Sequence, residues 1–582
     1  MERRLLLVFA LTFLVIMLFQ PILKKYGPQA PESKPQKQNQ PARNPQDQGA
    51  QNQGLQNEAA PPANSAVVEK GAATPPAAGV KQASAEAQTI IENDLYRITF
   101  TNRGAQVTSW ILKKFTDDKG GPLELVNSLA AAKYGYPLSL WSYDDSLRNK
   151  LNSALFVASS SGTLAAPAEI TFEYSGQGIS VRKTFGFDHT YVLRVETSVV
   201  SQGSPVAALP AWPAGFGDET SPSSYASSRI EYQNNSTIER LAIKKISGGN
   251  TVRGPFAWAG PVDQYFGAVF LPEDSQNATL ITLRNPVEVP RDPKNPNNKE
   301  TIKEDVLGAA VGDSRGETRE RMFVGPKSLP VLESVKVPTI AGTDQDLRGL
   351  VNFGFFGIIA RPLFLWLKWM TQYVGNWGWA IILQTLIITL ALMPLRISQM
   401  KSMLKMQRVA PQIKAIQEKY KKYGMRDPRK QAMNEEISAL YKKEGVNPAG
   451  GCLPLVVQLP FLWAYYAMLG VAIDLRHAHW LWIPDLSSAD PWHILPIGII
   501  ITMLLTQRMT PQQGMDPAQQ KMMNLLMPVM LGVISWNLAA GLTLYWSVSQ
   551  LIGIAQQAII NRTALGREMQ EMMAKRARKK EK

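Results

Sequence analysis

Five apolar stretches follow residue 378, and they constrain the fold of the chain more than any other feature of the sequence. Several are near or below the roughly 20 residues that a helix needs to cross a bilayer upright. Prolines also interrupt them, as at Pro394, Pro460 and Pro528. Such segments predict membrane-spanning helices in a locally thinned bilayer. The predicted spans are 379–395, 451–472, 493–508, 522–538 and 541–561.

The residues before these spans divide into an anchor, a linker and a β-rich domain. Residues 1–23 have a basic start and an apolar run without a small-residue cleavage site, which predicts an uncleaved membrane anchor. Residues 24–87 are rich in Pro, Gln, Ala and Asn, and this composition predicts a disordered linker. Between 88 and 345, alternating segments such as LYRITF and TYVLRVETSVV are separated by turn residues, which predicts an all-β sandwich.

The basic residues predict which loops face the cytoplasm. Residues 396–444 hold 13 Lys or Arg against 5 Asp or Glu, and the residues after 561 hold 8 against 3. Basic loops stay in the cytoplasm. We therefore expect six spans with both termini inside, the β domain outside, an outer loop at 473–492, and cytoplasmic segments at 396–450, 509–521 and 562–582.

Two amphipathic regions flank the first of the five spans. Residues 346–378 mix Arg361 and Lys368 with tryptophans, which favours a helix lying in the outer interface, with a buried core helix as the alternative. Residues 396–450 carry two apolar stripes separated by Gly424 and Asp427, which predicts a cytoplasmic helical hairpin. We expect this hairpin to meet ribosomes or emerging chains; a solvated topology signal is the alternative. The basic tail could bind anionic lipid or ribosomal RNA.

Polar side chains interrupt the predicted spans. Thr385, Thr389 and Arg396 fall within about 40° of one another on a helical wheel, with Gln384 to one side. Polar groups that face hydrocarbon are costly, so this face should look into protein or water. A shared wet groove would also explain the amides of Gln458, Gln550, Gln556 and Gln557. Helix packing is the alternative, with threonines bonded to their own helix and glutamines joining two helices.

Several classes of function are disfavoured. The single cysteine, Cys452, excludes an intramolecular disulfide and a multi-cysteine zinc site. The β domain lacks a nucleophile motif or a phosphate-binding glycine loop, so we expect neither an enzyme nor a cofactor or metal. A transporter or channel stays as the alternative function, although the five spans lack the Asp or Glu that proton-coupled carriers place within the membrane.

A set of long motifs resembles the YidC branch of the membrane-protein insertase superfamily. They are VGNWGWAII, MPLRISQMKSMLKMQRVAPQIKAI, YKKEGVNPAGGCLPLVVQLPFLWAYY, DPAQQKMMNLLMPVM and AAGLTLYWSVSQ. The resemblance implies a five-helix core around a hydrophilic groove that is closed outside and open to the cytoplasm and to lipid. It also implies insertion of nascent membrane proteins into the bacterial inner membrane, alone or beside the Sec translocon, without ATP hydrolysis. The N-terminal part resembles the Gram-negative form, whose periplasmic domain is a β-supersandwich akin to galactose mutarotase.

The resemblance also bears on single residues. Tyr545 and Trp546 match the family's aromatic pair and are assigned to a face along which substrates slide, with packing as the alternative. The family usually carries a cation five residues before the proline of the PL motif, and this chain has Thr389 there. Either Arg396 supplies the positive charge of the groove, or amides and water make the groove polar enough without a charge. From the sequence we expect the second.

Overall fold

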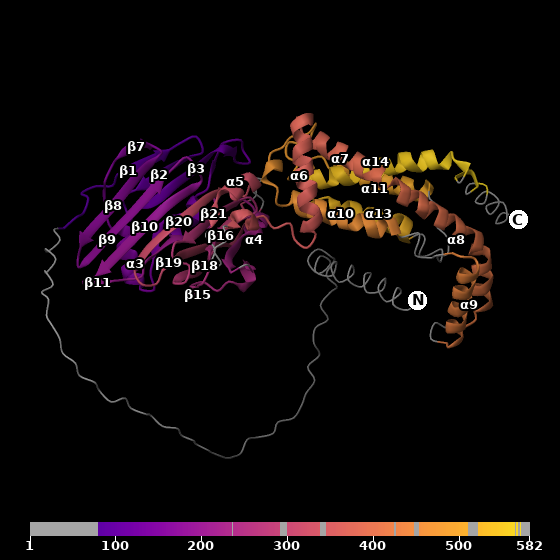
Figure 1. Ribbon diagram of the computed structural model, residues 1–582, viewed down its shortest axis with the longest axis horizontal. Helices are drawn as coiled ribbons and strands as arrows, with labels where there is room; N and C mark the ends of the chain where they lie inside the picture. Colours follow the sequence, from indigo (N-terminus) through magenta and orange to yellow (C-terminus); the bar gives the residue numbers. More distant parts are fainter. Residues whose placement is uncertain are drawn as a thin grey trace, which may run out of the picture. The chain divides into compact units, whose positions relative to one another are not determined.

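The computed structural model describes residues 80–235, 237–291, 299–337, 345–423, 427–446, 453–509, 522–564, 566–568 and 571 (Figure 1). The predicted anchor at 1–23 lies outside the described residues. So do most of the predicted linker, most of the segment 509–521 and most of the basic tail.

The first part of the described chain is a β-rich domain built mainly from three sheets. One sheet has the order β4 (Pro122–Glu124), β3 (Gln106–Thr116), β2 (Tyr96–Thr101), β1 (Gln88–Glu92), β7 (Gly162–Ala165). The largest runs β14 (Thr237–Ala242), β13 (Arg229–Asn234), β16 (Trp258–Val262), β17 (Phe266–Pro272), β20 (Glu317–Pro326), β10 (Val192–Ser201), β9 (Ile179–Phe187), β8 (Ala168–Gly176), β6 (Val157–Ala158), with β11 (Ser204–Pro205) beside β10. The third runs β15 (Asn250–Arg253), β18 (Ala278–Pro290), β19 (Thr301–Asp313), β12 (Leu209–Trp212), β5 (Ser139–Trp141).

Short elements complete this domain. A two-stranded sheet pairs β21 (Lys336–Val337) with β22 (Gln345–Asp346). The α-helices are α2 (Ser128–Tyr134), α3 (Asp145–Ser153), α4 (Pro222–Ser227) and α5 (Leu329–Ser334), and the 3₁₀ turns are η1 (Ile243–Lys245) and η2 (Leu347–Leu350).

The strands form because their apolar residues alternate, and the three sheets share one core. In β9, the residues at every second position from Ile179 to Phe187 are buried. Phe100 of β2 contacts Phe185 of β9 with ring centroids 5.1 Å apart, and Trp110 of β3 contacts Trp212 of β12 at 5.8 Å. Aromatic pairs at such distances contribute beyond their buried area, so these contacts join the first sheet to each of the other two.

One buried cation links loops of this domain. Lys183 of β9 is fully buried, and its Nζ donates to the carbonyls of Gly104 at 2.9 Å, Ala105 at 2.6 Å and Leu138 at 2.6 Å. Ala105 and Leu138 have φ of 48° and 62°, in the left-handed region that non-glycine residues seldom adopt. The three donors of one ammonium group therefore stabilise two strained turns that precede strands of different sheets.

The second part of the described chain is helical. It consists of α6 (Gly357–Val374), α7 (Trp377–Ala391), α8 (Met393–Lys419), α9 (Arg429–Lys443), α10 (Leu453–Leu469), η4 (Ile473–Leu475), α11 (Ile494–Met509), the π-turn η5 (Met522–Leu526), α13 (Met527–Ser535) and α14 (Ala540–Asn561). By length and composition, no single helix among the described residues could cross a membrane, whereas α6 and α7 qualify as a pair that bends by 120°.

Helix α6 presents apolar side chains both to the interior and to the surface. It buries Ala360, Leu363, Phe364, Leu367 and Met370, and it exposes Ile358, Leu365, Trp369 and Tyr373. Asn376 then caps α7, because its side chain accepts the backbone N–H groups of Gly378 and Trp379. The sharp bend between the two helices follows Gly375, which has a positive φ of 74°.

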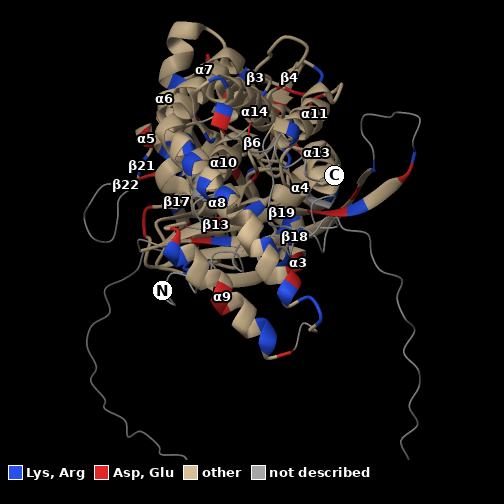
Figure 2. Cartoon of the chain, turned by 90° about the vertical axis from the view of Figure 1, so that its right-hand side faces the viewer, with Lys and Arg blue, Asp and Glu red and all other residues tan. Residues whose placement is uncertain are grey.

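Helices α8 and α9 pack against each other through a small apolar cluster of Met406, Val409, Ile413, Ile437, Leu440, Tyr441 and Val446. Asp427 accepts the backbone N–H of Arg429 at 2.9 Å, and Gly445 follows α9 with a positive φ of 59°. Figure 2 shows Lys and Arg at several positions along both helices, and most of these side chains are exposed. The pair therefore combines a thin apolar seam with a basic surface.

Replacing Lys183 by Met should destabilise the β domain by about 2–5 kcal/mol, because three buried carbonyls lose their donor. The change is measured by urea unfolding of the full chain, followed by the near-ultraviolet circular dichroism of its buried tryptophans. Arg182→Met is the matched control, since Arg182 is the exposed neighbour that pairs with Glu173, and it should cost under about 1 kcal/mol. Equal effects of the two variants would contradict the role of Lys183.

Candidate functional site: polar side chains among the apolar helices

Gln384 joins three helices through both ends of its amide. Its side chain has 0 % exposure. Nε2 donates to the carbonyl of Leu363 in α6 at 3.0 Å, and Oε1 accepts the hydroxyl of Tyr465 in α10. Tyr465 in turn stacks on Tyr545 of α14, with ring centroids 3.9 Å apart and ring planes 13° from parallel. We call Gln384, Tyr465 and Tyr545 the polar node; it connects α6, α7, α10 and α14.

The threonines of α7 satisfy their hydroxyls within their own helix. Thr385 is fully buried and donates to the carbonyl of Ile381 at 2.6 Å. Thr389 is half-buried and donates to the carbonyl of Thr385 at 2.8 Å. Gln384, Thr385 and Tyr545 therefore occupy the packed positions that the helix-packing alternative describes, and their role in a groove stays a prediction.

Arg396 and Thr389 meet through a residue of the last helix. Nη1 of Arg396 donates to Oε1 of Gln556 at 2.8 Å, while Nε2 of Gln556 donates to the carbonyl of Thr389 at 3.1 Å. Both partners lie far along the chain from Gln556, so only the packing of α14 against α7 and α8 brings them together. We call Arg396, Gln556 and the Thr389 carbonyl the arginine bridge.

The arginine bridge depends on a glycine. A Cβ added to Gly553 would lie 3.0 Å from Nη1 and 3.1 Å from Nη2 of Arg396, so the guanidinium lies against the backbone of α14. Arg396 is half-buried, and none of the described Asp or Glu residues forms an ion pair with it. Only one of its five N–H donors has a hydrogen bond among the described residues. Its charge is therefore open to a partner of opposite sign.

The remaining predicted site residues lie on α10 and α14. Nε2 of Gln458 donates to the hydroxyl of Ser549 at 3.2 Å. Trp546 and Gln550 are half-buried. The side-chain amide of Gln550 has no hydrogen bond to another described residue. The structure thus divides the predicted set into the polar node, the buried Thr385 beside it, the arginine bridge, the Gln458–Ser549 pair, and two half-buried side chains on α14.

Three participants were missed from the sequence. Tyr465 gave no signal beyond its aromatic neighbour Tyr466, Ser549 is a small residue in an apolar stretch, and Gly553 lacks a side chain. A glycine three residues before Gln556 and four before Gln557 could have indicated room for a large group on that face of the helix.

Gln384→Leu should lower the stability of the helical part by about 1–2 kcal/mol, because the Tyr465 hydroxyl and the Leu363 carbonyl lose their partner. Thermal unfolding of the purified full chain in detergent measures the change. Thr502→Val in α11 is the control: among the described residues its hydroxyl donates to carbonyls of its own helix, those of Gly498 and Ile499, so it should cost under about 0.5 kcal/mol.

A double variant provides a stricter test of the same node. Because Tyr465→Phe removes the same hydrogen bond, Gln384→Leu and Tyr465→Phe should be non-additive by about 0.5–1.5 kcal/mol. Additive effects would show that the two side chains do not act together.

Comparison with known proteins places the two parts of the chain in one family. The family described as "YidC periplasmic domain" matches residues 88–366, and the one described as "60Kd inner membrane protein" matches residues 369–567. The membrane protein insertase YidC of Geobacter sulfurreducens is 33% identical over 488 residues, which are 80% of this chain and 85% of that protein. The YidC of Campylobacter jejuni is 32% identical over 469 residues, 78% of this chain and 80% of that protein.

A solved structure of an active YidC insertase with its first transmembrane domain resolved aligns at 18% identity over 83% of this chain and 95% of that one. Its TM-score is 0.35. The sequence matches extend through both the β-rich domain and the helices. The chain belongs to the YidC family of membrane protein insertases.

Proposed function

We propose that this inner-membrane protein inserts nascent membrane proteins into the bacterial inner membrane and helps them to fold. Its relatives from Geobacter sulfurreducens and Campylobacter jejuni are named membrane protein insertases. Insertion needs no covalent chemistry: a polar tail must cross the bilayer, and an apolar segment then moves into lipid, where burial of its side chains supplies the free energy. The chain is accordingly not an enzyme.

The observation that carries the proposed mechanism is the free charge of Arg396. A cation among apolar helices is expensive unless it is paired, yet among the described residues Arg396 makes its side-chain hydrogen bond to the neutral amide of Gln556 and lies against the backbone of α14. We propose that Arg396 attracts acidic groups of an incoming outer tail. The groove would then be lined by the arginine bridge and by Gln458, Trp546 and Gln550.

This proposal differs from the expectation that amides and water suffice. The side chain of Gln556 bridges Arg396 and the backbone carbonyl of Thr389. The charge of Arg396 is therefore linked to the helix turn where the family usually carries a cation. Gln556 uses its carbonyl oxygen for the cation and its amide nitrogen for Thr389, which fixes the orientation of the amide.

The wider arrangement follows from the same proposal. Six spans would comprise the anchor 1–23 and the five apolar segments, with both termini in the cytoplasm. The α8–α9 pair and the basic tail would bind the ribosome. The Sec translocon would assist with some clients. Helix α6 would lie on the lipid surface through Ile358, Trp369 and Tyr373. Basic side chains are attracted to ribosomal RNA and to anionic lipid, and apolar side chains are stabilised at the lipid surface.

Site-specific photocrosslinking tests the insertion path. A photoreactive residue at Thr389 or Gln550 should crosslink to a ribosome-bound nascent chain carrying one transmembrane segment, and the crosslinks should move along that segment as it lengthens. Leu390 is the control because it is the exposed neighbour of Thr389 in α7, and it should crosslink mainly to lipid. Crosslinks from Leu390 alone would contradict the path and favour a transporter.

Arg396→Ala should reduce the insertion of a client with an acidic outer tail by about tenfold, because one charge-assisted hydrogen bond is worth about 1.5 kcal/mol. Protease protection of the translocated tail measures insertion. Thr389→Arg in the same chain should restore part of it. Arg408→Ala is the control, since Arg408 is an exposed cation of α8 that pairs with Glu568. A client whose acidic residues are changed to amides should be indifferent to Arg396→Ala; equal losses for both clients would refute the charge.

A further inference from the structure

The loop between α10 and α11, residues 473–492, holds a buried arginine against the β domain. Nη1 of Arg476 donates to the backbone carbonyl of Thr116 at 2.8 Å, at the end of β3. The side chain of Arg476 is only 8% exposed. Its guanidinium lies 5.9 Å and 5.6 Å from the ring centroids of Tyr265 and Phe266, at the start of β17. A cation placed between a carbonyl and two aromatic faces is well stabilised there.

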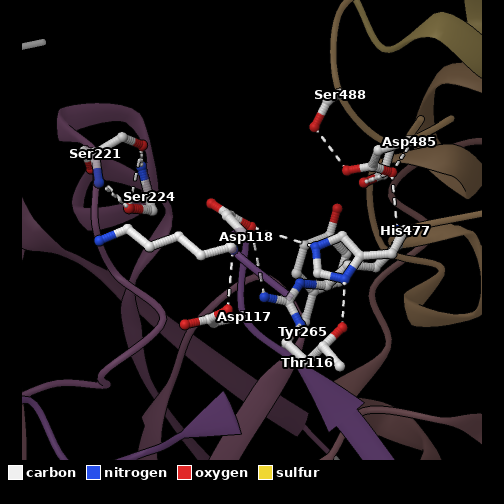
Figure 3. A network of polar contacts seen from close by, with 12 residues as sticks. Thr116, Asp117, Asp118, Ser221, Ser224, Tyr265, His477, Asp485 and Ser488 are labelled. Carbon is white, nitrogen blue, oxygen red and sulfur yellow. Dashed lines mark hydrogen bonds and ion pairs between the residues drawn. The ribbon is translucent and has the colours of Figure 1, made fainter. Parts of the chain in front are cut away.

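His477 makes a second set of contacts with the same turn. Its Nδ1 lies 3.0 Å from Oγ1 of Thr116, and its Nε2 lies 3.3 Å from Oδ1 of Asp118 (Figure 3). Its backbone N–H donates to Asp485 of the same loop at 3.0 Å, and its φ of 59° is in the left-handed region. A third contact comes from Gln264, whose Nε2 donates to the carbonyl of Gly470 at 2.9 Å.

The loop also contacts the helix ends nearest to it. The backbone N–H groups of Ala540 and Gly541, at the start of α14, donate to the carbonyls of Ser488 at 2.6 Å and Leu486 at 2.8 Å. Asn376, the cap of α7, donates to the carbonyl of His479 at 2.9 Å. Lys368 of α6 forms an ion pair with Asp474 at 2.9 Å. One loop therefore connects the turn after β3 with α6, α7 and α14.

Two buried carboxyl groups lie close to this contact on the β-domain side. Burial raises the pKa of Asp218 well above its ordinary value, the neighbouring Asp263 raises it further, and Arg476 opposes both effects. Burial also raises the pKa of Asp263, whose Oδ1 accepts the backbone N–H groups of Tyr265 and Phe266. Removing Arg476 would thus withdraw a compensating charge from the carboxyl pair as well as its own hydrogen bond.

We propose that residues 473–492 form a latch, locked by Arg476 and His477, through which the β domain restrains the adjoining ends of α6, α7 and α14. When the latch is closed, an ion pair holds α6, the Asn376 side chain holds α7 and two backbone hydrogen bonds hold α14 to a loop that the β domain fixes in place. When it opens, the loop loses its anchor and the helix ends gain freedom to move apart. The β domain thereby sets how readily the helices around the polar node rearrange.

Hydrogen exchange of the full chain in lipid nanodiscs tests the latch and needs no insertion activity. Arg476→Ala should accelerate amide exchange by about tenfold or more in two separate places, the turn at residues 116–121 and the start of α14 at residues 540–541. Arg315→Ala is the control, because Arg315 is an exposed arginine of the β domain whose ion pairs with Asp274 and Asp313 lie within that domain; it should leave both places unchanged.

A second variant keeps the test decisive if Arg476→Ala unfolds the chain. Asp118 is largely exposed and faces both Arg476 and His477, so Asp118→Asn should preserve the fold and accelerate exchange at both places by about two- to threefold. Acceleration at 116–121 together with 540–541 supports the latch. Acceleration confined to 116–121, or none in either place, overturns it.

Discussion

A polar side chain buried between apolar helices must find its hydrogen-bond partners inside the protein, and the helical part of this chain is organised by that requirement. Gln384 satisfies it with a carbonyl of α6 and a hydroxyl of α10. The hydroxyl belongs to Tyr465, which stacks on Tyr545. These contacts fix the relative positions of four helices with one amide and two rings.

The arginine bridge meets the same requirement only in part. Gln556 satisfies one donor of Arg396, and Gly553 lets the guanidinium approach the backbone of α14. The polar node is complete and suited to holding helices together. In the bridge, the other guanidinium donors of Arg396 have no partner among the described residues, which suits it to binding an acidic group. That contrast is why we assign packing to one cluster and recognition to the other, although both contain residues of the same predicted stripe.

The β domain solves a comparable problem with Lys183, whose three donors match three carbonyls of strained turns. Its outer surface contributes differently. Through Arg476 and His477, the turn after β3 contacts the loop that also touches the starts of α7 and α14. The domain and the helices are thus linked at this loop by polar contacts, and such contacts open more readily than a packed core.

The sequence alone determined which segments are apolar helices, which are alternating strands and where basic residues concentrate, because periodicity and composition act locally. It also marked Gln384, Thr389, Arg396 and the glutamines of α14 as polar residues that need an explanation. Only the tertiary structure decided their partners. Tyr465 lies 81 residues from Gln384, and Gln556 lies 160 residues from Arg396. No local pattern specifies such a pair, since it depends on the distance, rotation and crossing angle at which whole helices pack.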